Sequence, residues 1–185
     1  MRKIGQIFRF LIPVIALVAL VVFMTGAGRR ERATIEKNKA IVMRDFEVWN
    51  KGDMAALDEI YASNCIYYTT PGSEGNPEGI LRGREALKQH LVNCRTAFPD
   101  LHITLMDDLI AEGDKVACHW AWRSTFTGVV KEWGIPPTGK EVTFDGITIY
   151  QIAGGKIVKL WEYYRELTLW YQMGMKLVPA EQPGK

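Results

Sequence analysis

Cysteine and histidine are scarce in this chain, and neither is clustered. Cys65, Cys94 and Cys118 lie far apart without a C-x-x-C pair, and only three histidines occur among the 185 residues. A structural zinc site or a disulfide framework needs closely spaced ligands or paired cysteines. The sequence therefore predicts no metal site, and we interpret the cysteines as small buried hydrophobic residues. One disulfide is the alternative if the domain is exported.

The chain also lacks the short motifs of nucleotide-dependent and serine-nucleophile enzymes. It has no phosphate-binding loop, no dinucleotide fingerprint and no nucleophile elbow. Its net charge of +2 is misleading, because residues 1–32 hold six basic residues and one acidic residue, which leaves 17 basic and 20 acidic residues in the remainder. A mildly acidic domain without a basic stripe predicts no nucleic-acid partner.

An unbroken apolar run fills residues 10–24 and extends without a charge to Gly28. This length is close to the roughly 20 residues of a membrane-spanning helix and long for the core of a signal peptide. Thr25 and Ala27 form a weak small-x-small cleavage pattern, but the basic residues that follow disfavour translocation of the rest. We predict that residues 1–32 are an uncleaved, single-pass membrane anchor; export after signal cleavage is the alternative. The side of the membrane stays open, because basic residues flank the run at both ends: Arg2, Lys3, Arg9, Arg29, Arg30 and Arg32.

Residues 33–178 carry the periodicities of one α+β domain, and residues 179–185 form a tail. The first helix of the domain is predicted to begin at Thr34 and to present one apolar face, formed by Ile35, Val42, Phe46 and Trp49. Helices followed by strands indicate an α+β architecture with a strongly curved antiparallel sheet. The other predicted elements are helices at 53–61, 84–98 and 167–173 and strands at 65–69, 101–105, 115–126, 142–152 and 156–164.

The last two strands are joined by two glycines at residues 154–155, which is a strong hairpin signal. Counting back from this turn with strict alternation assigns each side chain to one of two faces. The predicted pocket face carries Tyr150, Thr148, Trp161, Tyr163 and Arg165. The opposite face carries Asp145, Ile147, Ile149, Leu160, Glu162 and Tyr164. Gly146, predicted to lie beside Tyr163, leaves room for a ligand on the pocket face.

Three short patterns occur in a fixed order between Phe98 and Arg165. They are Phe98-Pro-Asp100, then Gly134-Ile-Pro-Pro-Thr-Gly-Lys140, then Gly146-Ile-Thr-Ile-Tyr150 with Gly155-Lys-Ile-Val158 and Trp161. Together they resemble the SnoaL-like polyketide cyclases (ester cyclases) of the nuclear-transport-factor-2-like superfamily, and the resemblance extends from about Thr34 to Met175. It implies a cone of helices and curved sheet with one blind pocket. It also implies an intramolecular aldol closure of an aromatic polyketide ester, in which an aspartate moves the proton without a metal or cofactor.

This chain departs from the resembled family at the aspartate position, four residues after Trp161, where Arg165 stands. An arginine stays protonated, so it can stabilise an enolate oxygen but cannot remove a proton from carbon. Thr69 and Thr70 stand where relatives often have His and Asp, so the family's acid–base chemistry is expected to be lost. Arg165 then either anchors a ligand or forms a structural ion pair with one of three carboxylates, those of Glu166, Glu162 and Asp145.

Two functional hypotheses follow from this departure. The first is a membrane-tethered module that binds an apolar aromatic small molecule and uses Arg165 to anchor an acidic group. Its predicted walls are Trp161, Tyr163, Tyr150, Thr148 and Trp49. The second is a cofactor-independent cyclase or isomerase in which Arg165 holds the enolate and a relocated group is the base. The candidate bases are His119, Asp145 and Glu166. Under either hypothesis the other sheet face is expected to form a homodimer, as relatives often do.

Overall fold

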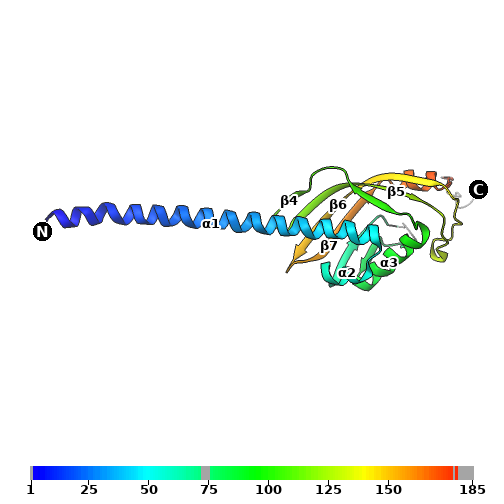
Figure 1. The fold of residues 1–185 in the computed structure, drawn as a ribbon, viewed down its shortest axis with the longest axis horizontal. Helices are drawn as coiled ribbons and strands as arrows, with labels where there is room; N and C mark the ends of the chain where they lie inside the picture. Colours follow the sequence, from blue (N-terminus) through cyan, green and yellow to red (C-terminus); the bar gives the residue numbers. More distant parts are fainter. Residues whose placement is uncertain (1, 72–75, 177, 179–185) are drawn as a thin grey trace, which may run out of the picture.

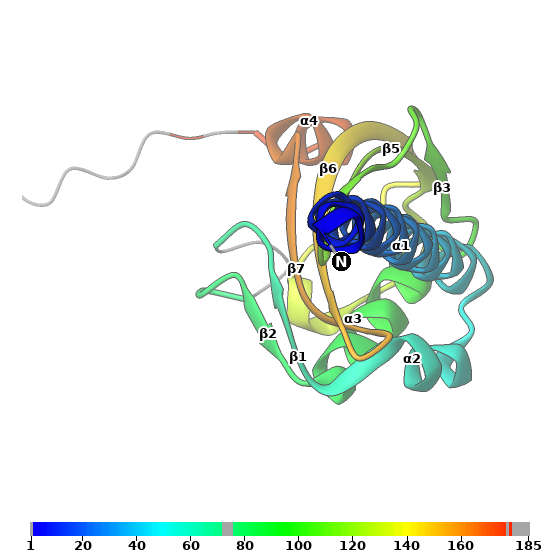
Figure 2. The same ribbon diagram turned by 90° about the vertical axis from the view of Figure 1, so that its left-hand side faces the viewer.

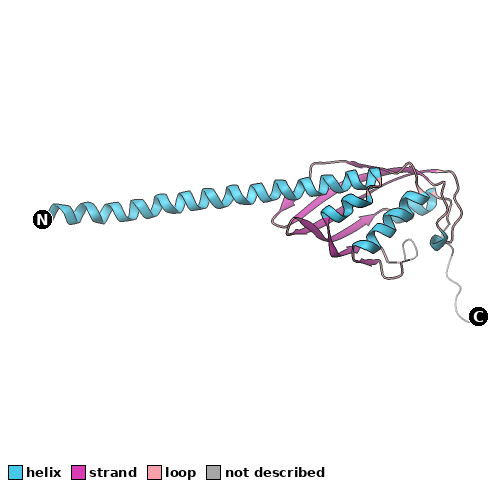
Figure 3. Cartoon of the chain, turned by 60° about the horizontal axis from the view of Figure 1, so that its bottom comes forward, coloured by secondary structure: helices cyan, strands magenta, loops and turns pink. Residues whose placement is uncertain are grey.

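The computed structural model describes the backbone of residues 2–71, 76–176 and 178, and the side chains of these residues except 2–25, 27 and 132. A long helix leads into an α+β domain in which helices pack against a curved sheet (Figure 1 and Figure 3). The helices are α1 (Arg2–Lys51), α2 (Met54–Ile60), α3 (Arg84–Ala97) and α4 (Glu166–Gln172), with a short 3-10 helix at Lys131–Trp133. The strands are β1 (Tyr61–Tyr68), β2 (Ile80–Arg82), β3 (His102–Leu105), β4 (Ile110–Glu112), β5 (Lys115–Thr125), β6 (Glu141–Ala153) and β7 (Lys156–Tyr164).

Helix α1 runs without a break through the position where the domain was expected to begin (Figure 1). Thr34 does not cap a helix; its hydroxyl donates to the carbonyl of Arg30, 3.1 Å away, inside α1. The predicted helix start at Thr34 is therefore wrong. The apolar run at 10–24 lies outside the residues whose side chains are described, so the membrane anchor stays a prediction. Among the residues described, no helix combines the length and the apolar character needed to cross a membrane.

Two other helix signals are confirmed. Asp53 caps α2, because its carboxylate accepts a hydrogen bond from the backbone N–H of Ala56 at 3.1 Å. Helix α3 ends at Ala97, just before Phe98 and Pro99, as expected from a proline that cannot continue the backbone hydrogen bonds. The start of α2 and the end of α3 thus follow local sequence chemistry.

The seven strands form one sheet in the order β2-β1-β7-β6-β5-β3, with β4 paired to β5. The sheet curves around α1 and α3 (Figure 2). The expected antiparallel pairing holds for all of these pairs except β1 and β7, which run parallel, so the sheet is mixed. No hairpin joins β1 to β7, because most of the domain lies between them in sequence, and local turn signals therefore do not fix their relative direction.

The turn between β6 and β7 is the predicted two-residue hairpin. Gly154 and Gly155 have φ angles of 58° and 75°, a region that favours glycine. Ala153 pairs with Lys156 across the turn, as expected. The sequence therefore located this turn correctly.

Beyond the turn, the register between β6 and β7 shifts by one residue at Gln151 and Ile152. Val158 is the extra residue in β7, which makes this a β-bulge. Because strand side chains alternate, one extra residue moves every later side chain of β7 to the face opposite to that given by strict alternation. Thr148, for example, pairs with Glu162. The predicted faces of β7 are therefore wrong from residue 159 onward.

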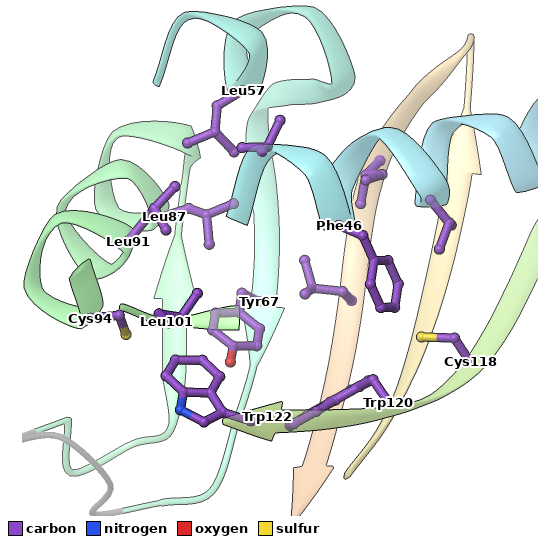
Figure 4. Close-up of a cluster of buried hydrophobic side chains, with 14 of the residues drawn as sticks. Phe46, Leu57, Tyr67, Leu87, Leu91, Cys94, Leu101, Cys118, Trp120 and Trp122 are labelled. Carbon is purple, nitrogen blue, oxygen red and sulfur yellow. The ribbon is translucent and has the colours of Figure 1, made fainter. Parts of the chain in front are cut away.

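The hydrophobic core fills the space between the sheet and helices α1, α2 and α3 (Figure 4). Leu57 of α2 and Leu87 and Leu91 of α3 are almost completely buried, as is Tyr67 of β1. Removing such apolar surface from water is the main term that holds the two layers together. Toward β5 the core becomes aromatic, and there it leaves a cavity.

Candidate functional site

The cavity is lined by residues of α1, α3, α4 and the strands β3, β5, β6 and β7. Its volume is about 50 Å³, which is room for a few water molecules. Pockets that hold drug-sized ligands usually measure about 300 Å³ or more, so only a compact group enters this cavity unless side chains move. Most of the wall is aromatic, with Trp49, Phe98, Trp120, Trp122, Phe144 and Tyr164 among its members.

Glu162 is one of two carboxyl groups among the described residues of the cavity wall. Its Oε1 accepts a hydrogen bond from the Tyr67 hydroxyl at 2.5 Å, and its Oε2 accepts one from Thr148 at 3.2 Å. Thr148 is completely buried and accepts in turn from the indole N–H of Trp120 at 2.8 Å. Because an indole N–H can only donate, the single hydroxyl hydrogen of Thr148 is available for Glu162. In this arrangement both oxygens of Glu162 accept hydrogen bonds from neighbouring hydroxyls.

Asp45 of α1 is the second carboxyl group, and it is only 1% exposed. The Tyr150 hydroxyl donates to its Oδ2 at 3.0 Å, whereas its Oδ1 has no hydrogen-bond partner among the described residues. Burial raises the pKa of Asp45 to about 7; the nearby hydroxyls of Tyr61 and Tyr150 oppose this shift, and the charge of Glu162 adds to it. The Tyr61 hydroxyl lies near Asp45 but without the geometry of a hydrogen bond. Burial therefore moves the titration of Asp45 toward neutral pH.

Helix α3 contributes His90 and Cys94 to the same wall. The His90 ring packs edge-on against Trp49, with 5.7 Å between ring centroids, and at a tilt against Tyr67, with 5.5 Å. The Cys94 sulfur lies 3.8 Å from Nε2 of His90. His90 also lines a separate groove on the outside of the domain, so it forms part of the partition between the cavity and the surface.

Gly146 provides space for an indole ring and not for a ligand. A Cβ atom at this position would lie 2.4 Å from Cζ2 of Trp120 and 2.8 Å from the carbonyl oxygen of Tyr163. Gly146 pairs with Tyr164, not with Tyr163 as predicted. The missing side chain therefore lets the Trp120 ring approach the backbone of β6 and reach Thr148.

Three of the predicted catalytic residues lie together, but on the sheet face away from the cavity: Arg165, His119 and Asp145. We call Asp107, His119, Asp145 and Arg165 the outer cluster. His119 Nδ1 is 2.7 Å from Asp107, His119 Nε2 is 3.3 Å from Asp145, and Arg165 Nε is 2.9 Å from the other oxygen of Asp145. The Arg165 side chain is 70% exposed. Arg165 thus forms the ion pair that the sequence left as an alternative, and it does not enter the cavity.

The hydrogen bonds of the outer cluster affect protonation of its histidine. The bond to Asp107, and next the bond to Asp145, raise the pKa of His119 above its ordinary value. The two carboxylates occupy opposite ring nitrogens, so they do not converge on one point. Accordingly, no group of three metal-binding side chains is found among the described residues. Glu166, the remaining candidate base, accepts a hydrogen bond from Trp170 within α4 at 3.1 Å and does not line the cavity.

The predicted ligand-binding residues divide between the two faces. Trp49, Thr148 and Tyr150 line the cavity. Trp161 instead stacks on a tyrosine of β1, with 5.5 Å between ring centroids, and Tyr163 is 64% exposed. Both lie outside the cavity because of the bulge in β7.

Sequence reasoning missed both carboxyl groups of the cavity, for different reasons. Asp45 stands between Val42 and Trp49 within the predicted apolar face of the first helix, so helical periodicity places it on the buried side. That signal was present in the sequence. For Glu162 the sequence carried no such signal, because its orientation depends on a bulge that the sequence does not mark.

These features define a class of protein, an α+β domain in which helices and a curved, unclosed sheet enclose an aromatic cavity with two carboxyl groups. Residues 40–173 match the family described as SnoaL-like polyketide cyclase. The chain belongs to this family, and the resemblance drawn from its sequence is confirmed.

Solved structures of similar chains agree with this assignment. IdmH of Streptomyces antibioticus, described as a candidate polyketide cyclase, is 27% identical with a TM-score of 0.64, over 75% of this chain and 99% of that one. A candidate polyketide cyclase of Acidithiobacillus ferrooxidans is 27% identical with a TM-score of 0.61, over 74% and 94% of the two chains. One from Bacillus cereus is 25% identical with a TM-score of 0.60, over 75% and 80%. No curated protein matches the chain.

Proposed function

We propose that the chain uses the cavity for cofactor-independent acid–base catalysis on an enolisable carbonyl compound of the polyketide kind. The observation that carries this proposal is that Asp45 and Glu162 line the same aromatic cavity. The binding-only hypothesis rested on a pocket without a titratable group, and that premise does not hold. The cyclase or isomerase hypothesis is therefore favoured, with a different pair of residues.

The environments of the two carboxyl groups support different roles. Glu162 accepts hydrogen bonds at both of its oxygens, as suits an ionised base. Asp45, whose pKa burial raises to about 7, supplies a proton near neutral pH. Since Tyr150 donates to Oδ2, that proton belongs on Oδ1, which has no other partner among the described residues. Asp45 is therefore the proposed acid.

In the proposed reaction, Glu162 removes a hydrogen from the carbon next to a carbonyl while Asp45 donates its proton to the carbonyl oxygen. The C–H electron pair becomes the double bond of an enol. The enol carbon then attacks a second carbonyl of the same molecule and forms the new C–C bond. The enol hydroxyl returns its proton to Asp45, and Glu162 protonates the new alkoxide, so both groups end as they began.

The pH dependence of α-hydrogen exchange tests this proposal. The full chain is incubated in D₂O with cyclohexanone and with aryl β-keto esters, and NMR follows loss of the α-hydrogens. Because Asp45 must be protonated, exchange should fall as pH rises through about 7. Asp45→Asn should lower the rate and remove this descending limb. If the limb persists in Asp45→Asn, Asp45 is not the acid.

We also propose that residues 1–32 tether the domain to a membrane. The apolar run between basic flanks supports this, and the continuity of α1 supports a stalk that enters the domain without a flexible linker. The test is fractionation of cells that express the full chain. Extraction of the chain from membranes by alkaline carbonate would contradict an integral anchor.

The outer sheet face supports a proposed homodimer. Ile147 is 50% exposed and Tyr163 is 64% exposed, and pairing of two such faces would cover apolar surface. Light scattering of the detergent-solubilised full chain should give the mass of a dimer, and Ile147→Asp should give a monomer. A monomeric wild type would refute this part of the proposal.

A further inference from the structure

We infer that the cavity selects ligands that present a compact, positively charged nitrogen group and rejects acidic ones. The sequence analysis predicted an acidic ligand, because it placed Arg165 in the pocket. The inferred ligand charge is the opposite one. The inference names the ligand class of the same cavity, so it rests on the proposed function for the location of the site. Its test measures binding and not turnover.

The charged groups of the cavity wall favour a cation. Asp45 and Glu162 are its acidic members, and none of the residues that line it within the described chain is lysine or arginine. Among the lining residues that the structure describes, His90 is the one that a proton can make cationic. Arg165 neutralises Asp145 in the outer cluster and contributes no charge to the cavity.

The aromatic walls of the cavity also favour a cationic ligand. Indole, phenol and phenyl faces carry partial negative charge and attract ammonium groups within about 6 Å of the ring centre, with Trp the strongest. Trp49, Trp120 and Trp122 all line the cavity. An anionic ligand would meet ring faces and carboxylates together, which are both repulsive. A neutral ligand would gain burial but no charge interaction.

An unsatisfied acceptor at the cavity wall fits a donor on the ligand. Oδ1 of Asp45 has no hydrogen-bond partner in the described chain, and the residue is 1% exposed. Buried polar atoms usually have a partner. When Asp45 is ionised, a protonated amine offers N–H donors to this oxygen, and the small volume of the cavity, about 50 Å³, suits such a compact head group.

A cationic ligand also answers a difficulty of the proposed chemistry. Negative charge develops on the substrate oxygen during enolisation, and cationic or hydrogen-bonding groups usually stabilise it. Here no lysine or arginine of the described lining is available, and Glu162 lies in the same wall. A positive charge on the substrate itself would offset the developing enolate.

Three probes that share a phenyl ring but differ in charge test the inference on the full chain. They are benzylammonium (positive), benzyl alcohol (neutral) and benzoate (negative). Quenching of tryptophan fluorescence and NMR shifts give the dissociation constants. We expect benzylammonium to bind about tenfold more tightly than benzyl alcohol, and benzoate to bind most weakly. Benzoate binding as tightly as benzylammonium, or no saturable benzylammonium binding, would overturn the inference.

Variants show whether the preference arises in the cavity. Glu162→Gln should reduce the preference for benzylammonium over benzyl alcohol to about threefold or less. Glu141→Gln, which removes an exposed carboxylate paired with Arg123, should leave it unchanged, and circular dichroism confirms that each variant is folded. An unchanged preference in folded Glu162→Gln would also overturn the inference.

The pH dependence provides a second readout that does not rely on Glu162. Tyr61, Tyr150, Cys118 and Glu162 are titratable groups that face Asp45, and His90 lines the same cavity. Benzylammonium affinity should rise from pH 6 to pH 8 in the wild type, and the rise should be smaller in Asp45→Asn, because the pKa of Asp45, about 7, lies in this range. An equal rise in this variant counts against the inference.

The two proposals can fail separately. If exchange activity is absent but the order of the three probes holds, the proposed function is wrong and the ligand class stands. If exchange occurs and depends on Asp45 but benzoate binds best, the chemistry stands and the ligand class is wrong.

Discussion

Two groups of titratable side chains lie on opposite faces of the same β6–β7 hairpin, and they differ mainly in their access to water. In the cavity, Asp45 is 1% exposed and its pKa is raised to about 7 by burial. In the outer cluster, the His119 side chain is 38% exposed and the pKa shift comes first from a hydrogen bond to Asp107. Residue types that look equally catalytic in sequence thus acquire different chemistry from the face on which they lie.

The largest expected effect is on catalytic activity, which should depend on the cavity and not on the outer cluster. Glu162→Gln should lower the rate of α-hydrogen exchange by about 10²- to 10⁴-fold, the usual contribution of a general base. Asp145→Asn removes a carboxylate of the outer cluster and should leave the rate within about twofold, because no proton-transfer step uses it. The two rates are measured side by side by NMR in D₂O. If Asp145→Asn is the damaging change, the outer cluster is the site and the comparison is reversed.

The burial of Asp45 also predicts a pH-dependent stability. Its pKa is about 7 in the folded chain and about 3.9 in an unfolded one. Between these values the folded state holds a proton that the unfolded state has released, so this contribution to stability falls as pH rises from 4 to 7. The loss between pH 5 and pH 8 is of the order of 3 kcal/mol.

Urea unfolding of the full chain at these two pH values checks this prediction. The matched control is Asp45→Asn, which keeps the shape of the side chain but cannot ionise. The wild type should lose stability relative to Asp45→Asn as the pH rises. Parallel behaviour of the two proteins would show that Asp45 does not titrate in this range.

A smaller effect is expected from the hydrogen-bond chain that holds Glu162. Thr148→Val keeps the shape of the side chain but removes the hydroxyl that accepts from the Trp120 N–H and donates to Glu162. Loss of one partner of a buried polar group costs about 1–3 kcal/mol. Thr143→Val, at an exposed position of the same strand, should change the free energy of unfolding by about 0.5 kcal/mol or less. Equal changes in the free energy of unfolding for both variants would refute the role of the hydrogen bonds made by Thr148.

The smallest effect concerns the outer cluster. NMR titration of His119 should give a pKa above 6.5, and Asp107→Asn should lower it. Because the folded pKa is raised, the stabilisation from this pairing is present below pH 6.5 and is lost as pH rises through the folded pKa. A pKa at or below 6.5 in the wild type would show that the exposed pairs are not formed in solution.

Much of the fold could be predicted from local chemistry. The family patterns from Phe98 to Trp161, the Asp53 cap, the stop before Pro99 and the glycine turn at residues 154–155 all correspond to observed features. Each depends on interactions within a few residues, which a sequence displays directly. The same holds for Asp45, whose place in the apolar stripe of α1 was a readable signal that the prediction did not use.

The candidate site depended on interactions that no local pattern encodes. The bulge at Val158 placed Glu162 in the cavity and directed Trp161 and Tyr163 outward, and the parallel pairing of β1 with β7 brought Tyr67 to Glu162. A one-residue register shift costs little locally, but it changes the face of every side chain that follows. The sequence by itself determined the family, the order of the elements and the residue types available for chemistry. Tertiary structure decided which of them face the cavity, because burial and register are properties of the packed sheet.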